Sequence, residues 1–403
     1  MRKKLKDVCD FYSGTGFPTK YQGETEGEYP FYKVGDIANN ATAGKIYLEL
    51  CNNYISSDVA KKIKGCILPK DTVVFAKIGE ALKLNRRAIT SCDCLIDNNA
   101  MGIAPRLDLL RIQYFYFFMK RLKMQTLAES TTVPSVRKAV LEAYEIEVPS
   151  LAEQEEIEKK LALMQKIIKK RRQELSALDE LVNARFVEMF GSISDGRFEM
   201  KTLPEIVNDD KKSIKRGPFG GALKKEDFVE DGYLVYEQRH AIHNDFNYAK
   251  YYITKEKYES MIGFKVVPGD LIISCSGTLG RIAEVPKSAK EGIINQALLK
   301  ISLNQDIMLN TFFIQQFRGE EIQEILFGFS RGSGIPNMPS MSEVKAVKFI
   351  CPPIELQNQF ADFVYQIDKS KLLAQIQLKN ITILLEICSI IYTNTNGNGE
   401  GTI

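Results

Sequence analysis

Two stretches of the chain hold residue types that could bind a cofactor or a methylation target. Ser13-Gly14-Thr15-Gly16-Phe17 is rich in glycine, but it neither follows a clear strand nor opens a clear helix, so the pattern favours a turn. Cys351-Pro352-Pro353-Ile354 has a double proline without the preceding acid and following aromatic residue of an amino-methyltransferase motif. Prolines at the start of a helix explain it better. Neither stretch predicts methyl transfer.

The acidic and histidine residues do not form a catalytic set either. Asp71 and Asp270 each precede a run that predicts a strand, but neither is followed by the acid-x-lysine pair of a metal-dependent nuclease. A turn before a strand is the simpler interpretation. His240 and His243 have no glutamate between them and no clear third ligand, so a metal site is a minor alternative. There is no phosphate-binding Walker loop. The sequence therefore predicts a non-catalytic chain that binds no metal or cofactor.

Polar and basic loop residues remain as candidates for recognition. Arg, Lys, Asn, Gln, Ser and Thr can contact base edges and phosphates. A solvated surface residue is the alternative for each one, and the glycine-rich stretch 330–334 is the best candidate because glycine allows close backbone approach. The candidate DNA contacts are Lys77, Lys83, Arg86, Arg87, Thr131, Thr132, Ser135, Arg137 and Lys138 in the first half, and Lys215, Arg216, Gln238, Arg239, Ser276, Thr278, Arg281, Arg331, Ser333 and Asn337 in the second.

Two heptad patterns organise the elements around these loops. Apolar residues recur at alternating spacings of four and three, which predicts two long helices that pair as a coiled coil. Ser150 and Glu153 form a capping box at the start of the first helix, and Gly191 ends it. Arg171 and Lys371 interrupt the pattern, and we expect them to fix the register. The seam residues are Ile157, Leu161, Met164, Ile168, Leu175, Leu178 and Val182, and then Phe360, Val364, Ile367, Leu378, Ile381 and Leu385.

The helices belong to an internal repeat. Each seam position of the second helix lies 203 residues after one in the first, and Gln357 corresponds to Gln154 in the same way. Strand-like and helix-like runs recur in the same order before each helix, which predicts an α/β (α+β) fold, and residues 107–127 predict a single helix. The expected segments are a globular domain at 1–148, a long helix at 149–191, a linker at 192–196, a second domain at 197–351, a long helix at 352–392 and a disordered tail at 393–403.

Bulk composition excludes some classes of protein. The chain has 403 residues, 44% of them hydrophobic and 26% charged, as expected for more than one globular domain. No apolar run is long enough to span a membrane, and the first residues do not form a signal peptide. The eight cysteines show no paired spacing, which predicts reduced thiols in a cytoplasmic protein. The net charge of +3 permits nucleic-acid binding without requiring it.

The chain resembles the specificity subunit of type I restriction–modification systems over almost its whole length. The resemblance rests on Pro149-x-Leu151-x-Glu153-Gln154-x-x-Ile157 with its long helix, on the matching Pro352-Pro353-Ile354-Glu355-Leu356-Gln357, on Leu5-x-Asp7-Val8, and on Ser330-x-Gly332-x-Gly334-Ile335-Pro336-Asn337. The second helix departs from the usual Glu-Gln pair, because Leu356 precedes Gln357.

The resemblance implies a DNA-recognition subunit without catalytic residues. Its two globular domains would be target recognition domains, each reading one half of a split DNA site. The helices would pair antiparallel, set the spacing between the half-sites and dock two methyltransferase subunits. Those subunits would hold S-adenosylmethionine, and motor–nuclease subunits would join for restriction. The alternatives are a stand-alone DNA-binding protein and a coiled-coil scaffold with two protein-binding domains.

Overall fold

The computed structural model divides into two compact units, each built from two parts of the chain. Unit 1 contains residues 1–172 and 376–403, and unit 2 contains residues 173–375. The two breaks therefore precede positions 173 and 376, which are 203 residues apart, the offset of the sequence repeat. The structure describes all residues except 50, 130–132, 220, 329–337 and 393–403, so the tail expected to be disordered lies outside it. In the part it describes, no helix is long and apolar enough to cross a membrane.

Unit 1 mixes short strands and helices before the long helices. They are β1 (Arg2–Lys4), α1 (Leu5–Val8), β2 (Cys9–Ser13), β3 (Tyr29–Tyr32), α2 (Val34–Thr42), β4 (Tyr47–Leu48), β5 (Tyr54–Ile55), α3 (Ser57–Lys62), β6 (Val73–Ala76), α4 (Glu80–Lys83), β7 (Arg87–Thr90), β8 (Leu95–Ile96), β9 (Ala100–Pro105), α5 (Ile112–Arg121), α6 (Met124–Leu127), α7 (Lys138–Glu142) and β10 (Glu145–Glu147), with one 3-10 turn at Thr19–Tyr21. One sheet has the strand order β2-β9-β6-β7-β4, a second has the order β5-β3-β8, and β1 pairs with β10.

Unit 2 has a corresponding set of elements. They are β11 (Met200–Thr202), β12 (Ile214–Arg216), β13 (Phe228–Val229), β14 (Tyr233–Tyr236), α9 (Gln238–His243), β15 (Tyr252–Ile253), α10 (Lys255–Ser260), β16 (Lys265–Val266), β17 (Leu271–Ser274), β18 (Ile282–Glu284), β19 (Gly292–Ile294), β20 (Leu298–Ile301), α11 (Asn310–Arg318), α12 (Glu320–Phe327), α13 (Met341–Ala346) and β21 (Lys348–Ile350), with 3-10 turns at Ile193–Asp195, Leu203–Glu205, Lys225–Asp227 and Ile262–Phe264. The sheets have the orders β12-β20-β17-β18 and β13-β15-β14-β19-β16, and β11 pairs with β21.

The two units share one topology. The order β2-β9-β6-β7 of unit 1 matches β12-β20-β17-β18 of unit 2, and β5-β3-β8 matches β15-β14-β19. Strand directions agree as well, because β3 pairs parallel with β8 and antiparallel with β5, just as β14 pairs with β19 and β15. The internal repeat predicted from the sequence is therefore a repeat of fold.

The predicted long helices are α8 (Leu151–Phe190) and α14 (Ile354–Tyr392), and each runs through both units. The capping box is confirmed, because Glu153 Oε2 accepts from the Ser150 amide at 2.9 Å and Ser150 Oγ accepts from the Glu153 amide at 3.3 Å. The hydrogen bond from Ser150 also lowers the pKa of the Glu153 carboxyl. Gly191 ends α8 with a positive φ of 69°, which glycine adopts without strain.

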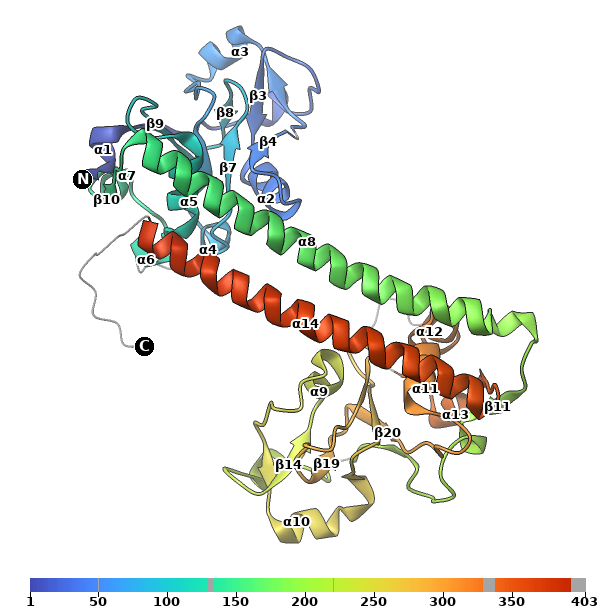
Figure 1. Cartoon of the computed structure of the whole chain (residues 1–403). Helices are drawn as coiled ribbons and strands as arrows, with labels where there is room; N and C mark the ends of the chain where they lie inside the picture. Colours follow the sequence, from blue (N-terminus) through green and yellow to red (C-terminus); the bar gives the residue numbers. More distant parts are fainter. Residues whose placement is uncertain (50, 130–132, 220, 329–337, 393–403) are drawn as a thin grey trace. The chain divides into compact units, whose positions relative to one another are not determined.

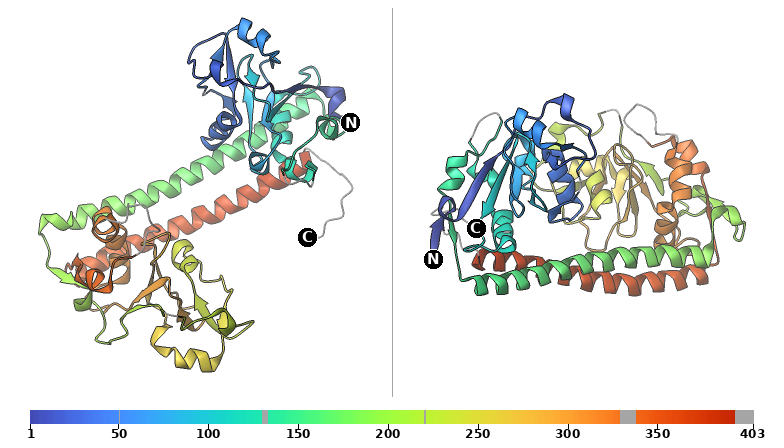
Figure 2. Two further views of the ribbon diagram at one scale, coloured as in Figure 1. Left: turned by 180° about the vertical axis from the view of Figure 1, so that it is seen from behind. Right: turned by 90° about the horizontal axis from the view of Figure 1, so that it is seen from above.

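Within each unit, one segment of α8 lies beside one segment of α14 (Figures 1 and 2). In unit 1, Leu385 near the end of α14 packs against the core that contains Ile157 and Leu161 from the first turns of α8. In unit 2, the ring of Phe360 near the start of α14 lies 5.7 Å, centroid to centroid, from the ring of Phe190 at the end of α8. The start of one helix meets the end of the other in both cases, so the segments run antiparallel. All the predicted seam residues are buried or half-buried.

The register contact of Lys371 is with Asp179 on α8. The Lys371 Nζ lies 2.7 Å from Asp179 Oδ1 in unit 2, and it lies 3.6 Å from Asp368 on its own helix. Arg171 belongs to unit 1, where its side chain is half-buried. Lys371 therefore pairs with an acid on the facing helix, and its role in fixing the register stays a prediction.

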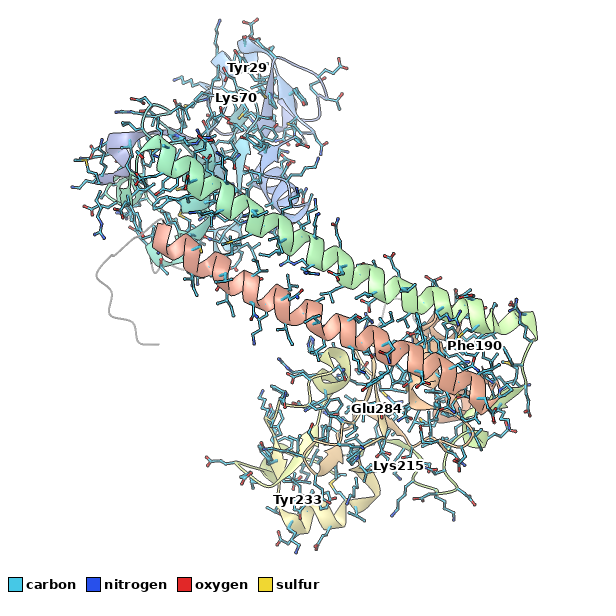
Figure 3. All side chains as sticks on the ribbon, in the orientation of Figure 1. Tyr29, Lys70, Phe190, Lys215, Tyr233 and Glu284 are labelled. Atoms are coloured by element: carbon cyan, nitrogen blue, oxygen red, sulfur yellow. The ribbon has the colours of Figure 1, made fainter. Side chains whose placement is uncertain are left out.

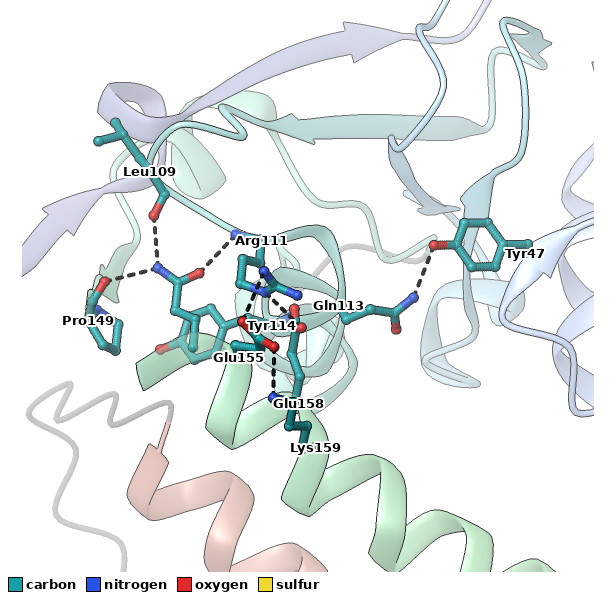
Figure 4. Close-up of polar contacts among 10 residues, drawn as sticks. Tyr47, Leu109, Arg111, Gln113, Tyr114, Pro149, Glu155, Glu158 and Lys159 are labelled. Carbon is teal, nitrogen blue, oxygen red and sulfur yellow. Dashed lines mark hydrogen bonds and ion pairs between the residues drawn. The ribbon is translucent and has the colours of Figure 1, made fainter. Parts of the chain in front are cut away.

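A buried glutamine anchors each long helix to its own globular domain. In unit 1, the Gln154 Nε2 donates to the carbonyl oxygens of Leu109 and Pro149 at 2.8 and 3.0 Å, and its Oε1 accepts from the Arg111 amide at 2.8 Å (Figure 4). In unit 2, Gln357 makes the same three bonds: its Nε2 donates at 3.0 and 2.8 Å, and its Oε1 accepts at 2.9 Å; its partners are Ile307 O, Pro352 O and the Leu309 amide. These contacts explain why a glutamine stands at both positions.

Unit 1 has a second polar anchor, at a position where unit 2 has an alanine. The Glu158 carboxylate accepts from the Tyr114 amide at 2.9 Å and lies 2.8 Å from Arg111 Nε (Figure 4). The residue 203 positions later is Ala361, which cannot make these contacts.

The prediction of one helix over residues 107–127 is wrong, because the chain forms α5 and α6 with a break at Leu122 and Lys123. Leu122 is extended, with φ −61° and ψ 110°. Its carbonyl oxygen accepts a hydrogen bond from Arg87 Nη2 at 2.8 Å. The break therefore supplies a buried arginine with a partner.

Candidate nucleic-acid interface

In unit 1, several candidate loops meet around one residue, Asp97. The Asp97 amide donates to Tyr32 O at 3.0 Å, and Asp97 Oδ2 accepts from the Val34 amide at 2.9 Å. Gly14 lies so close that an added Cβ would stand 1.7 Å from the Asp97 carbonyl oxygen. Only glycine fits there, because the backbone after β2 packs directly against Asp97. Asp97 also binds the amide of Val34, so it connects the end of β2 to the start of α2.

In unit 2, the same arrangement forms around Asn295. The Asn295 amide donates to Tyr236 O at 2.9 Å, and a Cβ on Gly217 would stand 1.8 Å from the Asn295 carbonyl oxygen. Gly14 and Gly217 are 203 residues apart, the offset of the repeat. The end of β12 and the start of α9 therefore meet at Asn295, as β2 and α2 meet at Asp97.

A turn after the central strand completes this face in each unit. In unit 1, the Lys77 amide donates to Asn99 O at 2.8 Å, and Lys77 O accepts from the Val136 amide at 2.9 Å. In unit 2, the Cys275 amide donates to Ala297 O at 2.8 Å, and Cys275 O accepts from the Met338 amide at 3.1 Å. The turns after β6 and β17 are thus held against the loops that precede α7 and α13.

These contacts bring some of the predicted residues together. Ser135 forms an isolated bridge with Ile78, next to Lys77, so Lys77 and Ser135 lie at the same turn. Ser276 and Thr278 lie in the corresponding turn of unit 2. Thr131, Thr132, Arg331, Ser333 and Asn337 lie outside the described residues.

Most other predicted residues of unit 1 already have charge partners. Lys83 pairs with Glu80 at 2.6 Å, Arg137 with Glu129 at 2.6 Å and Lys138 with Glu142 at 3.4 Å. Arg86 is half-buried. The paired cations offer less unbalanced charge to a polyanion than free ones would, so these residues do not form an open basic patch.

Arg87 does not lie on the surface as predicted. Its side chain is 3% exposed, and Nη2 donates to Asn85 Oδ1 and Leu122 O, both at 2.8 Å. Burial lowers the pKa of this guanidinium to about 10. Its hydrogen bonds join β7 to the break between α5 and α6, so Arg87 has a structural role in this fold.

The predicted cations of unit 2 differ from those of unit 1 in their neighbours. Lys215, Arg216, Arg239 and Arg281 have no carboxylate partner among the described residues. Three of them lie over aromatic rings: Lys215 over Phe264 at 5.0 Å, Arg216 over Phe219 at 5.1 Å and Arg239 over Tyr248 at 4.4 Å, each measured to the ring centroid. Cations held on rings without acidic neighbours keep their charge for a phosphate or a base.

One further cation was missed by sequence reasoning. Lys345, in the last turn of α13, lines a hollow of about 300 Å³ together with Lys215 and Arg216, and Phe219 and Phe264 are also in its wall. A lysine near the end of a short helix looks in sequence like a solvated residue that favours the helix dipole. Only the hollow that α13 and β12 line together identifies it as part of this face.

The histidine pair does not form a metal site in the described part of the chain. His240 is fully buried, its Nδ1 accepts from the Glu237 amide at 2.9 Å, and its Nε2 donates to Tyr248 O at 2.9 Å. His243 is exposed. Across the described residues, no group of three or more His, Cys, Asp or Glu side chains is placed to hold a metal.

Comparisons with known proteins agree with this architecture. The family described as the type I restriction modification DNA specificity domain matches residues 1–177 and 214–382. The type I restriction enzyme MjaIX specificity subunit of Methanocaldococcus jannaschii is 25% identical over 224 residues, which cover 53% of this chain and 48% of that protein, so the match spans about half the length of this curated relative.

Two solved structures share the fold. A crystal structure of the S subunit of a type I restriction–modification system from M. genitalium superposes with a TM-score of 0.52 at 14% identity, over 98% of this chain and 96% of that one. A chain from a structure on complex assembly and conformational transition of the type I R-M system superposes with a TM-score of 0.61 at 14% identity, over 98% of this chain and 97% of that one. At such identities the likeness concerns the fold alone.

Proposed function

The chain belongs to the family of type I restriction–modification DNA specificity domains, and we propose that it is the DNA sequence-recognition subunit of such a system. One observation carries the proposal: a single scaffold occurs twice, and the residues around its hub differ between the copies. The hub is the residue at which the loops of each unit meet, Asp97 in unit 1 and Asn295 in unit 2. Two such modules suit a split DNA site whose halves have different sequences. The modules are residues 1–148 and 197–351.

The spacing between the two half-sites is set by the long helices in this proposal. A helix of 40 residues, such as α8, is about 60 Å long. One turn of DNA is about 34–36 Å long. In this proposal, two modules that are anchored to helices of this length through Gln154 and Gln357 would address sites about one turn apart.

The chemistry belongs to partner subunits in this proposal. Two methyltransferase subunits would bring S-adenosylmethionine and methylate adenine, and motor–nuclease subunits would join for restriction. A system that modifies genomic DNA in this way acts in the cytoplasm, which is where we place the chain.

The outer side of α14 is the surface that we assign to methyltransferase docking. In unit 2 it exposes Tyr365, Leu372 and Leu373, each 59% accessible. In unit 1 it exposes the apolar residues Ile376, Ile383, Leu384 and Ile387. Apolar residues at spacings of three, four and seven form a stripe along a helix, which is the pattern that a partner helix recognises. An exposed apolar stripe of this kind is typical of a surface that binds another protein, and we assign a methyltransferase subunit to it.

Binding and methylation assays of the purified chain, alone and with its methyltransferase subunit, test the proposal. We expect weak, sequence-independent DNA binding by the chain alone, and methylation at a split motif when the methyltransferase subunit is present. Tight sequence-specific binding by the chain alone would support the stand-alone alternative. Failure to bind DNA even with the methyltransferase subunit would support a protein scaffold.

A further inference from the structure

Two polar side chains of unit 2 have no hydrogen-bond partner in the described chain. Across the described residues of both units, four buried side-chain atoms have no hydrogen-bond partner: Arg87 Nε, Arg216 Nε, Gln238 Oε1 and Gln316 Oε1. Arg87 and Gln316 still hydrogen-bond through another atom, since Arg87 Nη2 donates to Leu122 O and Gln316 Nε2 donates to Ile350 O. Arg216 and Gln238 make no side-chain hydrogen bond or ion pair with any described residue. Arg216 and Gln238 therefore differ from Arg87 and Gln316, each of which makes a side-chain hydrogen bond within the described chain.

Such unsatisfied groups weaken a fold. A buried donor or acceptor without a partner costs free energy, and most native proteins satisfy nearly all of them. The cost is recovered when a ligand supplies the missing hydrogen bond. Two polar side chains of one module that make no hydrogen bond with the described residues therefore indicate a site that a ligand completes.

Both side chains flank the hub at Asn295. Arg216 precedes Gly217, whose backbone touches the Asn295 carbonyl oxygen. Gln238 begins α9, two residues after Tyr236, whose carbonyl oxygen accepts from the Asn295 amide at 2.9 Å. The backbones that carry the two side chains are thus tied to the same residue, at the face that also carries Ser276 and Thr278.

The surroundings of Arg216 suit a polyanion. The hollow of about 300 Å³ that it lines contains two more cations, Lys215 and Lys345. Lys215 lies on β12, next to Arg216 in the sequence (Figure 3). Burial raises the pKa of the nearby Cys275 thiol to about 12, and the positive charge of Arg216 opposes that rise. These cations would hold a DNA backbone close to the hub.

The repeat shows that these two positions vary while the scaffold stays the same. Because Gly14 corresponds to Gly217, the counterpart of Arg216 is Ser13. Because the parallel strand pairs place Tyr32 opposite Ile96 and Tyr236 opposite Ile294, the counterpart of Gln238 is Val34. Residues that read different half-sites should differ in this way, while the backbone contacts around Asp97 and Asn295 stay the same.

We propose that Arg216 and Gln238 are specificity-determining residues of the second module, with Arg216 reading a guanine and Gln238 an adenine in the half-site bound by unit 2. Arginine donates two hydrogen bonds to guanine O6 and N7, and the glutamine amide accepts from adenine N6 and donates to N7. The inference rests on the proposed function, since it assigns base contacts to one of its two modules.

A map of modified adenines in cells that make the full chain and its methyltransferase subunit tests this inference. In the Arg216→Ala and Gln238→Ala variants, discrimination at one base pair of the unit 2 half-site should fall roughly 5- to 100-fold. The unit 1 half-site should be unchanged. Lys215→Ala is the matched control, because losing a phosphate contact should lower modification at all sites without changing the motif.

The outcomes separate the two claims. A split wild-type motif that both variants keep with full discrimination would overturn the inference alone, whereas a wild-type map without a split motif would overturn the proposed function together with it. Arg216→Met and Gln238→Leu address folding, because each removes an unsatisfied polar atom. Their thermal unfolding midpoints should equal or exceed that of the wild type, and clearly lower midpoints would show that the two residues are structural.

Discussion

Replacing Gln154 or Gln357 with alanine should destabilise the unit that each glutamine anchors by about 3 kcal/mol. Each amide is fully buried and makes three hydrogen bonds between 2.8 and 3.0 Å. Truncation removes the hydrogen bonds of two carbonyl oxygens and one amide, at about 1–3 kcal/mol for each group left unpaired. In unit 2 the Ile307 carbonyl oxygen still accepts from the Cys351 thiol at 3.6 Å. Water entering the vacated space replaces some of these bonds, so the expected total lies near the low end of the sum.

Hydrogen exchange followed by mass spectrometry is the suitable assay, because the chain has no tryptophan and the cost must be assigned to one unit. Gln154→Ala should lower the protection of slowly exchanging amides in unit 1, and Gln357→Ala should do so in unit 2. Gln173→Ala and Gln375→Ala are matched controls, since both side chains are exposed on the same helices and should cost at most about 0.5 kcal/mol. Equal effects of Gln154→Ala and Gln173→Ala would refute the anchoring role.

Three more predictions follow from the helices and the core. Deleting residues 169–175 together with 372–378 removes one heptad from each helix outside the domain cores. The spacing between the half-sites should then shorten by about 10 Å, or roughly three base pairs. Unchanged spacing in the modification map would contradict the idea that the helices set it. Lys371→Ala should lower the free energy of unfolding by roughly 0.5 kcal/mol at low salt and leave it unchanged in 1 M salt, because the partner carboxylate of Asp179 is 69% exposed. A larger or salt-independent loss in thermal unfolding would contradict this. Burial raises the pKa of Cys275 to about 12, so iodoacetamide at pH 8 should alkylate the exposed Cys66 and spare Cys275, and equal labelling would show that the core opens readily.

The repeat and the helix pair could be predicted from sequence because their signals are periodic. A seam of apolar residues and a constant offset of 203 fix both helices, and the glutamine shared by their starts already pointed to equivalent roles for Gln154 and Gln357. The strand order within each unit could not be predicted, since short strands pair over long separations. The break at Leu122 was hidden for a similar reason: its cause is Arg87, 35 residues away.

The recognition face could be predicted only as a composition of loops. Sequence cannot tell a cation that is paired, such as Lys83 with Glu80, from one that lies on a ring, such as Arg239 on Tyr248. It also cannot show that Arg216 and Gln238 have no hydrogen-bond partner among the described residues, because hydrogen bonding depends on every neighbour in space. The two glycines that approach Asp97 and Asn295 were visible as glycine-rich turns, but their equivalence needed the topology.

The central claim is that two modules of one chain read the two halves of a split DNA site. The most direct test exchanges residues 1–148 for the corresponding module of another family member and maps adenine modification in cells that also make the methyltransferase subunit. We expect a motif in which one half-site changes while the other half-site and the spacing between them are retained. A map in which both half-sites change, or in which the wild-type motif is continuous, would contradict it.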